Sequence, residues 1–149
     1  MAKSVVKKNG YQPTPVTLLN VLGGKKNRKI KYGALRVLLD TGCSDSLIRA
    51  CYCHAQKKLR SRETYSTGGG EITTKYKTQT FFTLPEFSDK KIIKWDFNVF
   101  DGDHLDYDVV IGRDILYNLK IDFSFDKTMV KWEGIEIPML DFKKLKNIN

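Results

Sequence analysis

The sequence has few cysteines, no long apolar run and no apolar leader segment. Its three cysteines are an odd number and too few for a scaffold held by disulfides, which favours a reducing compartment. No apolar stretch approaches the ~18–20 residues that a transmembrane helix needs. The first ten residues are basic and lack the apolar core of a secretory signal. We therefore expect a soluble protein.

The hydrophobic and aromatic content of the chain is sufficient for one folded domain. Hydrophobic residues make up 41% and aromatic residues 11% of the 149 positions, which excludes a wholly disordered chain. The length is that of one ordinary domain, and no repeat or linker divides it. We expect a flexible basic segment at residues 1–13, a domain at residues 14–141 and a basic tail at residues 142–149.

The net charge is +9, from 26 basic and 17 acidic residues. The basic residues gather in short segments, at residues 3–8, 25–31, 57–62 and 143–146. None of these segments is combined with the aromatic platform on which nucleic-acid bases stack. The charge therefore predicts a solvated surface, with nucleic-acid binding that is at most weak and nonspecific.

Short apolar and β-branched segments recur along the chain, and turn residues separate them. They predict strands at residues 16–22, 33–40, 47–48, 92–100, 107–111, 121–125, 129–132 and 135–139. Residues 63–83 predict a long hairpin with a glycine-rich tip, and residues 113–119 have the spacing of a short helix. This pattern predicts a mainly β, barrel-like domain with a short helix in its C-terminal half.

The sharpest local feature is an aspartate at the end of an apolar strand, in Leu38-Leu39-Asp40-Thr41-Gly42-Cys43-Ser44. A carboxylate next to a buried strand is costly unless it is hydrogen-bonded or has a function. Thr41 can hydrogen-bond the turn, and Gly42 lets another backbone or a substrate come close. Asp-Thr-Gly alone is also an ordinary turn sequence, so its meaning depends on what else the chain contains.

A second motif begins about 70 residues later, in Val110-Ile111-Gly112-Arg113-Asp114-Ile115-Leu116. With the Asp40 segment and the glycine-rich hairpin between them, the chain resembles the retroviral and retrotransposon aspartic proteases, the retropepsins, over residues 16–139. The resemblance implies a closed, mostly antiparallel β-barrel fold that works as a homodimer. The sequence holds a single Asp-Thr-Gly, whereas a two-lobed monomer would need two, and this independently favours one Asp40 from each of two copies.

The resemblance also assigns roles to single residues. Asp40 would be catalytic, Thr41 would brace the two active-site loops, and the Gly42 carbonyl would accept a hydrogen bond from the substrate. The flap that closes over an extended peptide would carry Thr67, Gly68, Gly69 and Gly70 at its tip. Gly112 and Arg113 would be structural, with Arg113 in an ion pair whose partner is Asp45 or Asp114. Candidates for the substrate pocket are Ser44, Asp45 and Ile111.

The implied reaction is hydrolysis of a peptide bond by a water held between two carboxylates that share one proton, the case that the aspartic proteases themselves exemplify. It needs no cofactor and no metal. Cys51, Cys53 and His54 lack a second ligand pair for zinc, and residues 101–108 lack the glycine and the glutamate of a calcium loop.

We therefore expect a homodimeric aspartic endopeptidase that processes a retrotransposon or retroviral polyprotein, in the cytoplasm or within virus-like particles. Residues 129–132 and 135–139 are candidates for the dimer-forming strands. Two alternatives stay open. One is a retropepsin-like dimerisation or peptide-binding module without turnover, and the other is a host protease domain of related fold.

Overall fold

The computed structural model describes residues 13–53, 58–67, 70–102 and 105–141. The predicted segments 1–13 and 142–149 therefore lie outside this description, except for Pro13. The strands are β1 (Pro13–Thr14), β2 (Val16–Gly23), β3 (Lys29–Ile30), β4 (Leu35–Leu39), β5 (Leu47–Arg49), β6 (Lys58–Thr67), β7 (Gly70–Leu84), β8 (Ser88–Phe100), β9 (Val109–Ile111), β10 (Asp122–Ser124), β11 (Met129–Trp132), β12 (Ile135–Pro138) and β13 (Leu140–Asp141). The helical elements are η1 (Lys25–Asn27), η2 (Ala50–Tyr52) and α1 (Arg113–Leu119).

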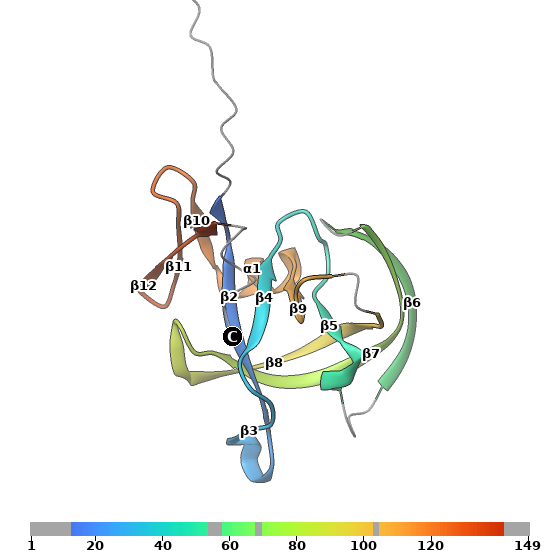
Figure 1. Cartoon of the computed structure of the whole chain (residues 1–149). Coiled ribbons are helices and arrows are strands. Elements are labelled where there is room, and N and C mark those ends of the chain that lie inside the picture. The colour runs from blue at the N-terminus through green and yellow to red at the C-terminus, as the bar shows by residue number, and fades with distance from the viewer. Residues whose placement is uncertain (1–12, 54–57, 68–69, 103–104, 142–149) are drawn as a thin grey trace, which may run out of the picture.

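The main sheet closes into a barrel. Its strand order is β3-β2-β4-β9-β5-β8-β7-β6, and a further pairing of β2 with β7 joins six of these strands into a closed ring. Figure 1 shows the long β7 and β8 curving around the shorter strands. The mainly β, barrel-like prediction is confirmed. The ring also contains two parallel pairs, β4 with β9 and β5 with β8, so it is not antiparallel throughout.

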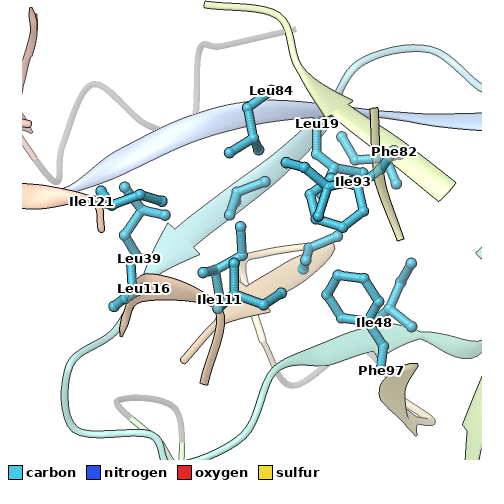
Figure 2. Close-up of a cluster of buried hydrophobic side chains, with 14 of the residues drawn as sticks. Leu19, Leu39, Ile48, Phe82, Leu84, Ile93, Phe97, Ile111, Leu116 and Ile121 are labelled. Carbon is cyan, nitrogen blue, oxygen red and sulfur yellow. The ribbon is translucent and has the colours of Figure 1, made fainter. Parts of the chain in front are cut away.

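The barrel encloses an apolar core because its strands alternate between inward and outward side chains. In β4, Leu35, Val37 and Leu39 are buried while the intervening residues are partly exposed. Figure 2 shows Leu39 and other side chains of the core converging from several strands and from α1. Phe82 and Phe97 meet edge to face, with ring centroids 5.4 Å apart, a favourable geometry for aromatic pairs.

Two smaller sheets lie outside the barrel. Strands β10, β11 and β12 form an antiparallel meander, and β1 pairs with β13 near the two ends of the described chain. Pro13, expected in the flexible lead, pairs with Asp141 instead. The predicted strands at residues 129–132 and 135–139 pair with each other within one chain, and their role in a dimer stays a prediction.

Helix α1 spans the residues that its spacing predicted. Ile115 and Leu116 are buried on the side that faces the core, and Lys120 ends the helix in a left-handed conformation with φ of 57°. Among the described residues, no helix is long and apolar enough to cross a membrane. The buried face of this short helix belongs to the barrel core, and the helix contacts β9.

Candidate active site

The parallel pairing of β4 and β9 brings the two sequence motifs together. Leu39 pairs with Ile111, so both strands end at the same edge of the sheet. The Asp40 N–H donates to the Ile111 carbonyl at 2.8 Å and extends this ladder by one bond. Residues far apart in the sequence thus meet because the two strands run in the same direction.

Asp40 opens the turn at this edge. Its side chain is half-buried, and the carboxylate oxygen Oδ1 accepts a hydrogen bond of 2.8 Å from the Gly42 N–H. The Cys43 N–H closes the turn on the Asp40 carbonyl at 3.2 Å, while Thr41 and Gly42 are exposed. Among the described residues, no basic side chain forms an ion pair with Asp40. The carboxylate is oriented by backbone and remains available at the surface.

Gly112 lets the second motif approach the Asp40 turn. A Cβ atom placed on Gly112 would lie 2.6 Å from the Cys43 carbonyl oxygen and 2.9 Å from that of Asp45. Both distances are far below van der Waals contact, and both partners are backbone atoms. This closeness lets the Arg113 N–H donate to the Cys43 carbonyl at 2.8 Å. Any side chain at position 112 would collide with this backbone, so the position requires glycine. The resemblance had assigned Gly112 a structural role.

Asp114 is the centre of the hydrogen-bond network that holds the loop. Its Oδ1 accepts from the Ser46 hydroxyl at 2.7 Å and from the Ile115 N–H at 2.8 Å. Its Oδ2 accepts from the Ser46 N–H and from the Trp95 indole N–H, each at 3.0 Å. The Ser46 hydroxyl in turn accepts from the Gly112 N–H at 3.0 Å. One carboxylate thus links the Asp40 loop, β8 and α1.

The ion pair expected for Arg113 is not found among the described residues. The Arg113 side chain is exposed, and its contribution to the loop is the backbone hydrogen bond to Cys43. Asp114, expected as a partner of Arg113, is occupied by four hydrogen bonds from other groups. Among the described residues, Asp114 rather than Arg113 supplies the side-chain contacts that hold this loop.

Cys43 follows the Asp-Thr-Gly triplet and is buried. Its Sγ donates to the Asp45 carbonyl at 3.0 Å. Burial raises the pKa of the Cys43 thiol to about 11, with a further contribution from the nearby Asp40 and Asp114 carboxylates. The thiol is thus neutral near pH 7, and it packs under the loop as a small apolar group.

The pocket candidates separate into accessible and inaccessible residues. Ser44 is exposed and Asp45 is half-buried, and Asp45 lines a polar cavity of about 470 Å³ together with Asp114 and Lys77. Ile111 is 0% exposed and belongs to the barrel core. Its assignment to a substrate pocket is therefore wrong for the side chain, which a substrate cannot reach. Its carbonyl instead fixes the Asp40 backbone.

A second groove lies beside the Asp40 loop and shares Asp114 with the polar cavity. It has a volume of about 570 Å³, and its lining includes Thr41, Leu116, Tyr117 and Ile121. Tyr117 is 83% exposed, the highest value among the large hydrophobic residues that the structure describes. The exposed ring and the apolar lining of this groove together form a surface that a partner could cover.

The long hairpin predicted at residues 63–83 is present as β6 and β7. The pairing runs from Lys58 with Thr78 to Thr67 with Gly70 and has an irregularity between Arg60 and Glu63. Gly68 and Gly69, the expected centre of the flap tip, lie outside the described residues. The backbone thus forms a hairpin of the expected kind, and the role of Thr67–Gly70 as a flap stays a prediction.

The loop before β9 is held by a separate network. The Arg49 guanidinium donates to the carbonyls of Leu105 at 2.9 Å and Tyr107 at 2.7 Å, and it lies 3.7 Å from the Asp108 carboxylate. The Tyr52 hydroxyl donates to Asp108 at 3.3 Å, and burial together with this carboxylate raises the pKa of Tyr52 to about 12. Residues 105–108 are therefore held in place by Arg49 and Tyr52, next to the start of β9.

Sequence reasoning missed two members of the Asp114 network, Ser46 and Trp95. Ser46 is completely buried in spite of its hydroxyl. Trp95 lies in β8, far from either motif in the sequence. A buried hydroxyl and an indole N–H both need acceptors, but the sequence does not say which carboxylate supplies them. The described residues contain no group of three side chains placed to hold a metal ion.

Comparison with solved structures identifies the fold. The retroviral protease-like domain of Ddi1 from Leishmania major superposes with a TM-score of 0.58 at 14% identity, covering 87% of this chain and 95% of that one. The EIAV protease complexed with the inhibitor HBY-793 gives 0.53 at 22% identity, covering 80% and 100%. No family model and no curated protein matches the sequence. The fold is retropepsin-like, and identities this low establish the fold alone.

Proposed function

We propose that the chain is an aspartic endopeptidase in which two copies each supply one Asp40. The observation that carries this proposal is the state of the Asp40 carboxylate. It is half-buried at the end of a core strand and is oriented by the Gly42 N–H at 2.8 Å. Among the described residues it has no ion-pair partner. A purely structural acid at such a position would be expected to have one.

Two copies are required by the chemistry. Hydrolysis of an amide needs a base that activates water and an acid that protonates the carbonyl oxygen. The sequence contains one Asp-Thr-Gly, and a single carboxylate cannot serve both needs in one step. Two Asp40 carboxylates that face each other cannot both ionise cheaply, so the pair holds one proton and offers one acid and one base.

The proposed reaction proceeds through a bound water. The ionised Asp40 takes a proton from the water, and the resulting hydroxide attacks the scissile carbonyl carbon. The protonated Asp40 of the second copy donates its proton to the carbonyl oxygen. Collapse of the tetrahedral intermediate breaks the C–N bond, and the first carboxyl gives its proton to the leaving amine. The second carboxylate takes a proton back from a hydroxyl of the intermediate, so the pair again holds one proton. The rate should therefore fall at both low and high pH, because a doubly protonated pair lacks the base and a doubly ionised pair lacks the acid.

The groove beside Thr41 is the face on which we place the second copy. Thr41 directly follows Asp40, so any twofold axis that brings two Asp40 side chains together also brings this groove close to its own copy. Such an axis produces a self-complementary interface. The exposed Tyr117 ring and the apolar side chains of Leu116 and Ile121 supply surface that an interface would bury.

The substrate we propose is a polyprotein that the enzyme cleaves in extended conformation under the β6–β7 hairpin. A strand-like peptide binds by backbone hydrogen bonds and presents alternate side chains to the pockets. The fold is similar both to a viral protease and to a domain of Leishmania major Ddi1. A host protease domain therefore stays the second candidate for the biological setting, with the same chemistry.

The test is digestion of a peptide library between pH 4 and pH 7 by the wild type and by Asp40→Asn. We expect cleavage by the wild type, its loss in Asp40→Asn and retained peptide binding by that variant. Asp126→Asn, which changes an exposed turn residue, is the matched control and should cleave normally. Cleavage that persists in Asp40→Asn would contradict the proposal. Peptide binding without any cleavage by the wild type would favour a module without turnover.

A further inference from the structure

The β2–β3 hairpin carries a dense cluster of positive charge that the proposed peptidase chemistry does not use. We call residues 24–31 the basic arm. It contains five cations and no acidic residue, and all five cations are exposed. They are Lys25, Lys26, Arg28, Lys29 and Lys31. Such a concentration of one sign of charge on an exposed element favours an anionic partner.

The basic arm has a defined backbone shape. Strand β3 pairs antiparallel with the end of β2, Ile30 with Leu22 and Lys29 with Gly23. The Lys31 N–H donates to the Val21 carbonyl at 2.9 Å, and the turn is closed by the Asn27 N–H on the Gly24 carbonyl at 3.3 Å. The basic arm is thus a two-stranded ribbon that presents its cations from a fixed backbone, so binding would cost little ordering of the chain.

The charges of the basic arm are not used within the fold. Among the residues that the structure describes, no carboxylate forms an ion pair with any of the five cations. Ile30, 57% exposed, is the one large hydrophobic side chain exposed on the arm. The arm therefore lacks the apolar face with which a membrane-binding element enters lipid.

The basic arm lies at the opposite end of β2 from the candidate active site. Val16 pairs with Leu38 near Asp40, whereas Leu22 pairs with Ile30 of the arm. Six residues of extended strand separate these two points by about 20 Å. Figure 1 shows β3 projecting beyond the barrel, away from the end where β4 leads into the loop toward β5. The arm is therefore a separate surface that can be changed without touching the Asp40 loop.

We propose that the basic arm binds the phosphodiester backbone of nucleic acid, independently of base sequence. Closely spaced cations match a polymer that carries one negative charge per ~1.7 Å of duplex axis, and a two-stranded ribbon fits the major groove of a duplex. The arm contains no aromatic residue on which bases could stack. Its contacts would therefore fall on phosphates, and affinity would depend steeply on salt.

The test is the anisotropy of labelled 20-nucleotide RNA and duplex DNA, titrated with the full chain over a range of NaCl concentrations. The variant Lys25→Gln/Lys26→Gln/Arg28→Gln removes three cations. It should bind about tenfold or more weakly at low salt, with a slope of log K against log salt smaller by about two to three. The comparison of RNA with duplex shows whether the ribbon prefers a groove.

The matched control is Lys90→Gln/Lys127→Gln/Lys131→Gln, which removes three exposed lysines outside the arm. It should bind almost as the wild type does, and equal loss in both triple variants would overturn the proposal. If the protein bound anionic vesicles but not nucleic acid, the proposal would be overturned as well. Asp40→Asn should bind nucleic acid like the wild type, so the outcome here is independent of whether the chain is a peptidase. Thermal unfolding of both triple variants, compared with that of the wild type, checks that both are folded.

Discussion

The two ends of the β2–β4 strand pair are built in opposite ways. At one end, the Asp40 loop is fixed by backbone contacts with Gly112 and by the hydrogen bonds of Asp114. At the other, the basic arm extends into solvent and its side chains have no partner among the described residues. The same strand pair thus holds the Asp40 carboxylate in a fixed position at one end and exposes cations at the other, about 20 Å away. Substitutions should be costly for folding at the first end and almost neutral at the second.

The largest expected contrast is between two Gly→Ala substitutions. Gly112→Ala places a Cβ 2.6 Å from the Cys43 carbonyl oxygen, so the Asp40 loop must shift. We expect the free energy of unfolding to fall by about 3 kcal/mol, at the upper end for overpacking, with loss of peptidase activity. Gly33→Ala, which follows the basic arm, meets no atom within 4 Å and should change stability by less than about 1 kcal/mol. Urea unfolding of both variants checks this, and equal effects would contradict the comparison.

The next contrast concerns the hydrogen bonds of Asp114. Asp114→Ala leaves the Ser46 N–H and the Trp95 indole without their acceptor. Unsatisfied buried donors cost about 1–3 kcal/mol each, and because both of these hydrogen bonds are only partly buried we expect a total loss of about 2 kcal/mol. Asp126→Ala, in an exposed turn, should remain within about 0.5 kcal/mol of the wild type. Thermal unfolding followed by circular dichroism measures both, and a stable Asp114→Ala would show that the loop is held by other contacts.

A third contrast compares the exposed apolar residues at the two ends. Tyr117→Lys places a charge on the face proposed for the second copy, and we expect the dimer dissociation constant to rise about tenfold or more. Ile30→Lys, on the basic arm, should leave it unchanged. Sedimentation equilibrium measures both constants, and the activity of Tyr117→Lys should recover as its concentration is raised. If Tyr117→Lys left the dimer dissociation constant unchanged, the interface would have to lie on another face.

The smallest expected effect is a difference in thiol reactivity. Cys43 is buried and its pKa is raised to about 11, so only about one part in a thousand is thiolate at pH 8. Cys51 is exposed. Iodoacetamide at pH 8 should therefore modify Cys51 and spare Cys43, and labelling of Cys43 should accelerate as the pH rises towards 11. Peptide mapping after labelling measures this, and rapid modification of Cys43 at pH 8 would show that the loop opens.

Much of the fold could be predicted because its signals are local. The helix at residues 113–119 and the strand at residues 129–132 have the expected bounds, since apolar spacing and flanking turn residues define them. Strand β3 and the pairing of β1 with β13 were not predicted. They are two residues long, and their formation depends on pairing with partners rather than on their own composition.

The candidate site could be predicted only where one residue type serves one purpose. The place of Asp40 at a strand end was predicted from the apolar run before it. A close backbone approach was expected at Gly42, whereas the structure has it at Gly112. An ion pair was assigned to Arg113, whereas the side-chain contacts of the loop come from Asp114, and Ile111 was assigned to a pocket and lies in the core. Neighbouring residues at a strand end or helix start point in different directions, and the backbone path decides which side chain turns inward.

The central claim is most directly tested by mixing wild type with Asp40→Asn. The two proteins are unfolded and refolded together in varying ratio at fixed total concentration above the dimer dissociation constant. If both copies of Asp40 are needed, activity follows the square of the wild-type fraction, so an equal mixture retains about one quarter of the activity. A linear fall, with about one half retained in the equal mixture, would show that each chain works with its own Asp40 alone and would contradict the account.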